Sequence, residues 1–113
     1  MTAAAIPPRL RALARAVERA IEALPGVTRA VMWGSRNFKV GKKLFVCLLV
    51  SPKGILLEFK LPEDEARAAV LAGKAEPHSF RNLAASGWVK VLLRSRKDLP
   101  RIVRWVRTSR ELY

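Results

Sequence analysis

The 113-residue chain has little of what catalysis, metal binding or membrane insertion usually requires. It contains one cysteine and one histidine, which excludes an internal disulfide and a cysteine-rich metal site. Its glycines are dispersed, so it has no glycine-rich loop to cradle a phosphate. No apolar run approaches the roughly 18 residues that span a bilayer, and the N-terminal segment lacks the apolar core of a secretory signal. We therefore expect a cytoplasmic protein with no cofactor, no metal and no membrane partner.

Acidic residues are also scarce. Lysine and arginine number 22 against 9 acidic residues, which gives a formal net charge of +13 at pH 7. A small domain this basic attracts polyanions, nucleic acid first and an anionic membrane second. A basic surface that is merely solvated is the alternative, because net charge does not by itself specify a function.

Two apolar runs in the middle of the chain predict a β-hairpin. Residues 44–50 and 55–61 are rich in β-branched and aromatic side chains, and Ser51-Pro52-Lys53-Gly54 between them has the composition of a turn. In the second run side chains point alternately to the two faces of the strand, so one face is expected to lie in the core and the other to be partly exposed to solvent. The first run is apolar on both faces and is expected to lie inside the sheet.

Other patterns predict helices at three places. Apolar residues recur at helical spacing over residues 9–24 and again after residue 98, where Asp98 is expected to cap the helix. Pro62 followed by three acidic residues starts another helix. Between these, we expect strands over 27–33, 38–40 and 87–94, turns at 34–37 and 95–97, and an irregular loop over 74–86.

Together these elements predict an α+β fold. Residues 1–113 are expected to form a single compact domain, with residues 1–8 as a loose lead-in. Short connections favour antiparallel pairing, so we expect an antiparallel sheet of about five strands. The amphipathic helices must bury their apolar stripes, which they do most simply by packing on one side of the sheet.

A series of short motifs resembles the MmcQ/YjbR family. In order along the chain they are Trp33-Gly34, Phe38-x-Val40, Gly41-Lys42-Lys43-x-Phe45, Leu57-x-Phe59-Lys60, the Pro77 loop, Gly87-Trp88-Val89-x-Val91 and Ser109-x-x-x-Tyr113. The resemblance runs from near Pro25 to Tyr113. It implies a compact α+β domain and a DNA-binding role with a double-wing arrangement. No catalytic activity is established for the family.

The predicted nucleic-acid site lies on the solvent side of the sheet and on its turns. Basic residues interleaved with aromatic ones suit phosphate contacts and base stacking. The residues predicted for this site are Arg36, Lys39, Lys42, Lys43, Lys53, Lys60, Trp88, Lys90 and Arg94. For each lysine the alternative is a solvated strand edge, and for Trp88 it is a packed position in the sheet.

The last predicted helix is a rival basic surface. Its arginines recur at intervals of three and wind around the outer side, where they could follow a phosphate backbone with Trp105 as a further contact. They are Arg101, Arg104, Arg107 and Arg110. A plain amphipathic helix with an arginine exterior is the alternative.

We expect a non-enzymatic nucleic-acid-binding protein. No recognition-helix or zinc-finger motif is visible, so binding should depend on phosphates without sequence specificity, with DNA favoured over RNA and a monomer favoured. His78 stands in a loop without nearby cysteines, and Cys47 lies within a predicted buried strand, so neither indicates catalysis. The alternative function is a protein-interaction adaptor, because the predicted arrangement of a sheet with helices is similar to secretion-chaperone-like folds.

Overall fold

The computed structural model describes residues 5–32 and 35–113, and within these ranges it contains a six-stranded antiparallel sheet. Along the chain the elements are α1 (Pro8–Glu22), β1 (Val27–Met32), β2 (Ser35–Val40), β3 (Lys43–Ser51), β4 (Gly54–Lys60), α2 (Glu63–Leu71), β5 (Glu76–Pro77), α3 (Arg81–Ala85), β6 (Trp88–Leu93), the 3-10 turn η1 (Arg96–Asp98) and α4 (Leu99–Arg110). The strand order is β1-β2-β3-β4-β6-β5. The predicted α+β class is confirmed, with six strands where about five were expected.

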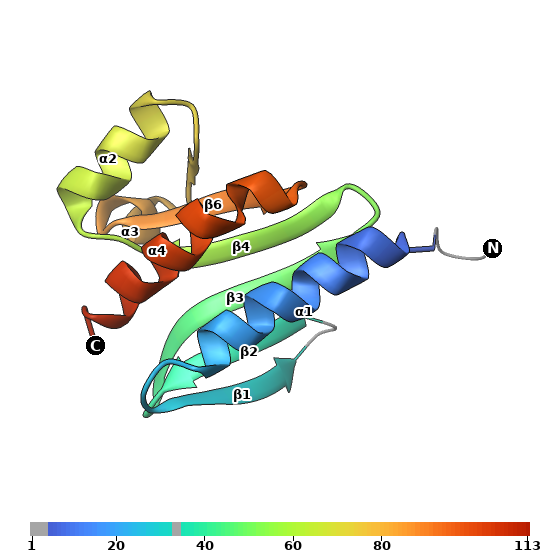
Figure 1. Cartoon of the computed structure of the whole chain (residues 1–113). Coiled ribbons are helices and arrows are strands. Elements are labelled where there is room, and N and C mark those ends of the chain that lie inside the picture. Colours follow the sequence, from blue (N-terminus) through green and yellow to red (C-terminus); the bar gives the residue numbers. More distant parts are fainter. Residues whose placement is uncertain (1–4, 33–34) are drawn as a thin grey trace.

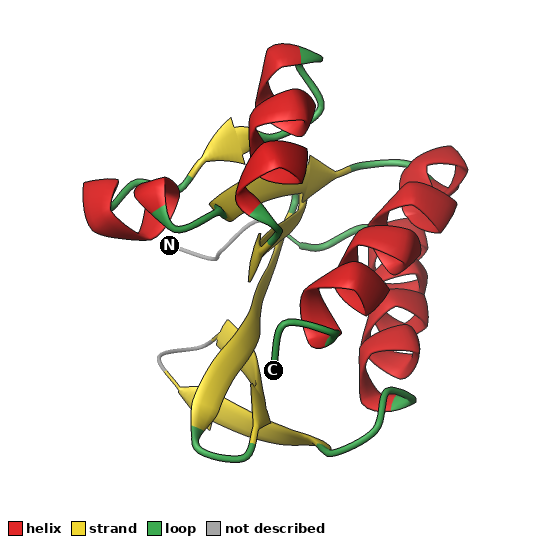
Figure 2. Ribbon diagram, turned by 90° about the vertical axis from the view of Figure 1, so that its left-hand side faces the viewer, coloured by secondary structure: helices red, strands yellow, loops and turns green. Residues whose placement is uncertain are grey.

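The two long helices cover one face of the sheet. α1 and α4 lie side by side and begin at the same end of the molecule, so they run parallel (Figure 1). Their apolar stripes are buried, with Leu10, Val17 and Ile21 of α1 and Ile102 and Val106 of α4 each at most 2% exposed. Figure 2 shows α3 on the other side of the sheet. The predicted packing on one side therefore holds for the long helices, but not for this short one.

Strand register determines which side chains face the helices. Phe38, Val46, Phe59 and Val89 lie directly opposite one another on β2, β3, β4 and β6, and all are buried. Because side chains alternate along a strand, the neighbours of these residues point to the opposite side, which we call the open face; the exception is Phe45, which is buried at the register shift between β2 and β3. The central hairpin is confirmed, and β3 is an interior strand as predicted.

Three local predictions were wrong. β2 begins at Ser35, where a turn was expected. The predicted loop over residues 74–86 contains β5 and α3, which are two and five residues long and therefore too short for a periodic pattern. Asp98 makes no side-chain capping bond; its Oδ1 lies 3.4 Å from Nη1 of Arg101 instead. The motif residues Trp33 and Gly34 lie outside the described residues.

Candidate nucleic-acid interface

The two lysine-bearing hairpin turns lie at opposite ends of β3. Lys42 is in the turn between β2 and β3, and Lys53 is in the turn between β3 and β4. The nine residues of β3 separate the turns by roughly 25–30 Å at the usual rise of a strand. A rigid domain therefore presents these lysines as parts of two separate surfaces.

Lys53 adjoins the end of β6, because Ile55 pairs with Leu93 across the β4–β6 ladder. Gly54 permits this close approach. It has a φ of +146°, and a Cβ at this position would lie 2.8 Å from the Leu93 carbonyl oxygen and 3.2 Å from Cγ of Arg94. The stem of Arg94 therefore packs against the β3–β4 turn, which places the two cations on one surface.

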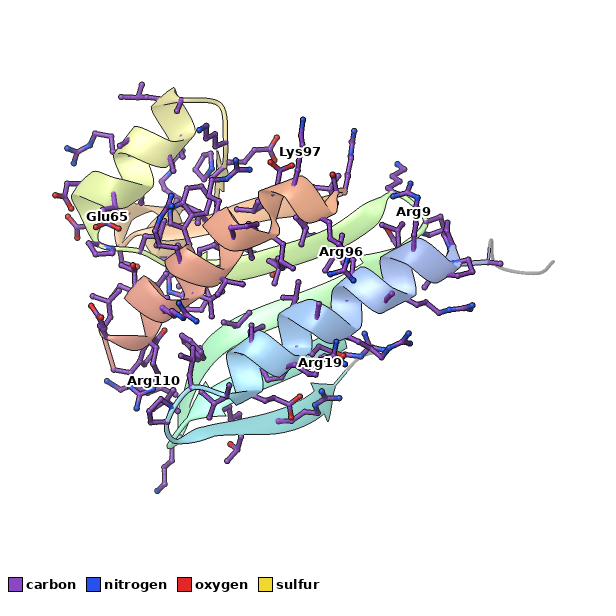
Figure 3. The ribbon with its side chains drawn as sticks, viewed as in Figure 1. Arg9, Arg19, Glu65, Arg96, Lys97 and Arg110 are labelled. Atoms are coloured by element: carbon purple, nitrogen blue, oxygen red, sulfur yellow. The ribbon has the colours of Figure 1, made fainter. Side chains whose placement is uncertain are left out.

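The starts of α1 and α4 bring further cations to the same end. Nη1 of Arg9 donates a hydrogen bond to the carbonyl oxygen of Arg94 at 3.1 Å. Figure 3 shows Arg9, Arg96 and Lys97 where the two long helices begin, and Glu65 at the opposite end of the molecule. We call this surface the basic end, and define it as Arg9, Lys53, Arg94, Arg96 and Lys97.

Helix dipoles add to the positive potential of the basic end. The N-terminus of an α-helix carries a partial positive charge, which acidic residues in the first turn normally offset. In the described structure α1 has no acidic residue in its first turn and α4 has only its N-cap residue Asp98, which pairs with Arg101, whereas the first turn of α2 has Glu63, Asp64 and Glu65. Placing arginine and lysine here opposes helix stability and favours a bound anion.

A groove of about 590 Å³ lies on the open face next to the basic end. Its floor includes Leu49, Leu56 and Leu92, which lie directly opposite one another on β3, β4 and β6. Four cations from three segments line it as well: Lys53, Lys74, Lys90 and Arg94. The acidic residue of this lining is Glu76, whose Oε2 lies 3.9 Å from Nζ of Lys90. The groove thus combines an apolar floor with basic walls.

Comparison with known families identifies the chain. A family model described as YjbR matches residues 22–112. The chain belongs to the YjbR family. This confirms the resemblance that the motifs indicated from near Pro25 onward. Comparisons with curated proteins and with solved structures found no match. In the described parts of this YjbR chain, no helix is long and apolar enough to cross a membrane.

Of the residues predicted for the site, the structure brings together Lys53, Lys90 and Arg94 around the groove of the YjbR domain. Lys39, Lys42 and Lys43 lie at or near the opposite hairpin turn. Four further cations of this surface were not predicted from the sequence: Lys74, Arg9, Arg96 and Lys97. Arg96 and Lys97 follow Arg94 closely in the sequence, so a local run of charge could have indicated them. Lys74 and Arg9 are distant in sequence and reach the surface through the fold.

Arg36 was expected at the solvent side of the sheet and instead faces α1. Its Nε lies 2.9 Å from Oε1 of Glu18, a residue that is 6% exposed. The cause is the early start of β2: with Ser35 already in the strand, alternation turns Arg36 to the same side as Phe38. The positive charge of Arg36 therefore offsets a buried carboxylate, although 41% of the Arg36 side chain stays exposed.

Trp88 lies on the open face, opposite Lys60 in the β4–β6 ladder and away from the basic end. Its half-buried ring stands edge-on to His78, with centroids 6.1 Å apart. It lines a different pocket, of about 330 Å³, which Val70 of α2 and Ala84 of α3 also line. The structure therefore does not place Trp88 in the groove, and the packed alternative describes its surroundings better.

The rival surface on α4 is smaller than its four arginines indicate. Trp105 is 9% exposed and packs against Phe59, with ring centroids 6.3 Å apart. Arg110 donates from Nε to the carbonyl oxygen of Pro25 at 2.7 Å, and Arg101 faces Asp98. Arg104 and Arg107 remain exposed. The helix is mainly a packing element, as the amphipathic alternative predicted.

Cys47 lies beside the groove on the open face, opposite Glu58. Burial and, to a smaller extent, the negative charge of Glu58 together raise the pKa of the thiol to about 11. Glu58 Oε2 also lies 3.1 Å from Nε2 of His78, whose Nδ1 accepts a hydrogen bond from the Phe80 amide. Across residues 5–32 and 35–113, no group of three metal-ligating side chains forms.

The raised pKa predicts slow alkylation of Cys47 in the folded protein. Only the thiolate reacts appreciably, so the rate should rise with pH to a midpoint near 11, above the ordinary thiol value of 9.0. Iodoacetamide rates between about pH 7 and 11.5, with circular dichroism to verify folding, measure this. Glu58→Gln should lower the midpoint. A wild-type midpoint near 9 would contradict the burial of the thiol.

Proposed function

We propose that this YjbR-family chain is a non-enzymatic protein that binds nucleic acid, DNA in preference to RNA, through phosphate contacts. The observation that supports this is the gathering of unneutralised cations at the basic end and around the adjoining groove. Among the residues that the structure describes, six of these cations have no carboxylate partner: Arg9, Lys53, Lys74, Arg94, Arg96 and Lys97. Unpaired cations that converge from separate elements suit a polyanion.

The shape of the surface supports a long polyanion. The basic end and the groove share Lys53 and Arg94, so the positive surface continues from the starts of the helices onto the open face. The β3–β4 hairpin, with Lys53 at its tip, is suited to lie against a sugar-phosphate backbone as a wing. Most protein–DNA hydrogen bonds go to the phosphate and sugar and carry no sequence information, so we expect no preferred base sequence.

A salt series on the wild-type protein tests this proposal. Fluorescence anisotropy with labelled duplex DNA, single-stranded DNA and RNA, between about 50 and 300 mM salt, gives the dependence of affinity on ionic strength. If five phosphates are contacted on duplex DNA, log affinity should fall with log salt with a slope of about −4.5. Absence of binding at the lowest salt, or affinity independent of salt, would refute the proposal.

A further inference from the structure

The groove on the open face has a feature that phosphate contacts do not require, namely its apolar floor. Leu49 is 45% exposed and Leu92 is 39% exposed, and Leu56 lies between them in the same cross-strand row. On a chain with a net charge of +13, apolar side chains left open to water among lysines lower solubility without stabilising the core. Their placement indicates a ligand that is both apolar and anionic.

The walls of the groove define the anionic part of that ligand. Lys53 comes from the β3–β4 turn, Lys74 from the segment after α2, and Arg94 from the end of β6. Lys90 stands in β6, where its Nζ donates to Oγ of Ser79 at 3.0 Å. Cations on several sides of an apolar floor match a ligand with several negative charges around an apolar centre.

Single-stranded nucleic acid has this combination of groups. Its bases expose apolar faces when they are unstacked, and its phosphates lie at regular intervals beside them. Duplex DNA keeps its base faces stacked inside the helix, so it offers phosphates to the walls and nothing to the floor. Resting on the proposed function, we propose that the groove binds single-stranded nucleic acid, with bases on Leu49, Leu56 and Leu92 and phosphates at the surrounding cations.

The continuity of the basic surface favours a nucleic-acid strand over a compact ligand. The volume of about 590 Å³ falls within the range of small-ligand sites, roughly 300–1,000 Å³. However, the cations do not stop at the groove, because Arg94 contacts Arg9 and the chain continues into Arg96 and Lys97. The occupant is therefore a chain of anions that extends past the groove. An acidic peptide with apolar side chains is the competing occupant.

An abasic oligonucleotide separates the contribution of the bases from that of the phosphates. The probes are a labelled thymidine oligomer, an abasic oligomer of the same length and charge, and a duplex. Wild-type protein is expected to bind the thymidine oligomer about tenfold more tightly than the abasic one, because apolar contact with a base contributes less on leucine than on an aromatic ring. Equal affinity for the two would overturn the inference and leave the proposed function intact.

The variant Leu49→Ser with Leu92→Ser tests the floor directly. Both side chains are partly exposed, so the substitution should leave the fold intact, which circular dichroism checks. Affinity for the thymidine oligomer should fall about tenfold, to the level of the abasic oligomer, while affinity for the abasic oligomer and the duplex stays within about twofold. The matched control is Leu71→Ser with Leu112→Ser, which are 82% and 43% exposed and lie outside the groove. This control should bind all three probes like wild type.

The remaining outcomes distinguish the two proposals. If the floor variant weakens all three probes equally, the leucines do not contact bases and the inference fails. If no probe binds at low salt, the proposed function fails with it. If an acidic peptide containing leucine binds more tightly than the thymidine oligomer, and the floor variant abolishes that binding, the groove belongs to a protein partner and the inference is overturned.

Discussion

Reversing three charges around the groove, with Lys53→Glu, Lys74→Glu and Arg94→Glu, is expected to lower affinity for duplex DNA roughly 100-fold or more. Each reversal removes an attraction of up to about 1 kcal/mol and adds a repulsion of similar size. The salt slope should become shallower by about 2.7, because three fewer phosphates displace counterions. Anisotropy at several salt concentrations measures both effects.

The opposite hairpin provides a control with the same change in net charge. Lys39→Glu, Lys42→Glu and Lys43→Glu alter the other end of β3, and should reduce affinity less than about tenfold through the general field of the protein. All six side chains lack a carboxylate partner within the described structure, so both variants should fold. If the two variants lost affinity for duplex DNA equally, net charge, and not the position of the basic end, would determine binding.

Gly87→Ala is expected to lower the free energy of unfolding by about 3 kcal/mol or more. Gly87 has a φ of +104°, and a Cβ there would lie 2.1 Å from the carbonyl oxygen of Leu61. The amide of Leu61 donates to the Gly87 carbonyl oxygen at 2.9 Å, so the two backbones cannot separate without losing this bond. Backbone displacement here would disturb the junction at which β4 ends and β6 begins.

Gly41→Ala is the matched control for this substitution. Gly41 also has a positive φ, +62°, but no atom lies within 4 Å of the position that its Cβ would take. The Gly41→Ala substitution should therefore lower the free energy of unfolding only by the strain of a left-handed residue, about 1–2 kcal/mol. Urea unfolding of both variants measures the difference. Similar destabilisation by the two substitutions would contradict the proposed clash with Leu61.

Much of the fold could be predicted because the long elements have strong local patterns. The apolar stripe of α1 and the alternation in β4 each follow from the period of one element, and the turn between β3 and β4 follows from its proline and glycine. β5 and α3 could not be found in this way. β5 has two residues and pairs with Val89 and Lys90, and that pairing depends on a strand distant in sequence.

The sequence predicted the chemistry of the candidate site, but not which residues form it. The excess of basic residues and the lysine at the hairpin tip indicated phosphate contacts. Which lysines share a surface depends on strand direction, which sends Lys42 and Lys53 to opposite ends of β3. Which face a residue occupies depends on where its strand begins, and the start of β2 at Ser35 turned Arg36 toward Glu18.

By itself, then, the sequence of this YjbR-family chain determined the helices, the central hairpin, the α+β class and the family, because periodicity and turn chemistry act over neighbouring residues. Tertiary structure alone decided where the charges converge. Lys74 reaches the groove beside Lys53 and Arg94 because β4 and β6 pair and the segment after α2 returns beside β6. Such convergence results from packing between distant segments, which no local pattern encodes.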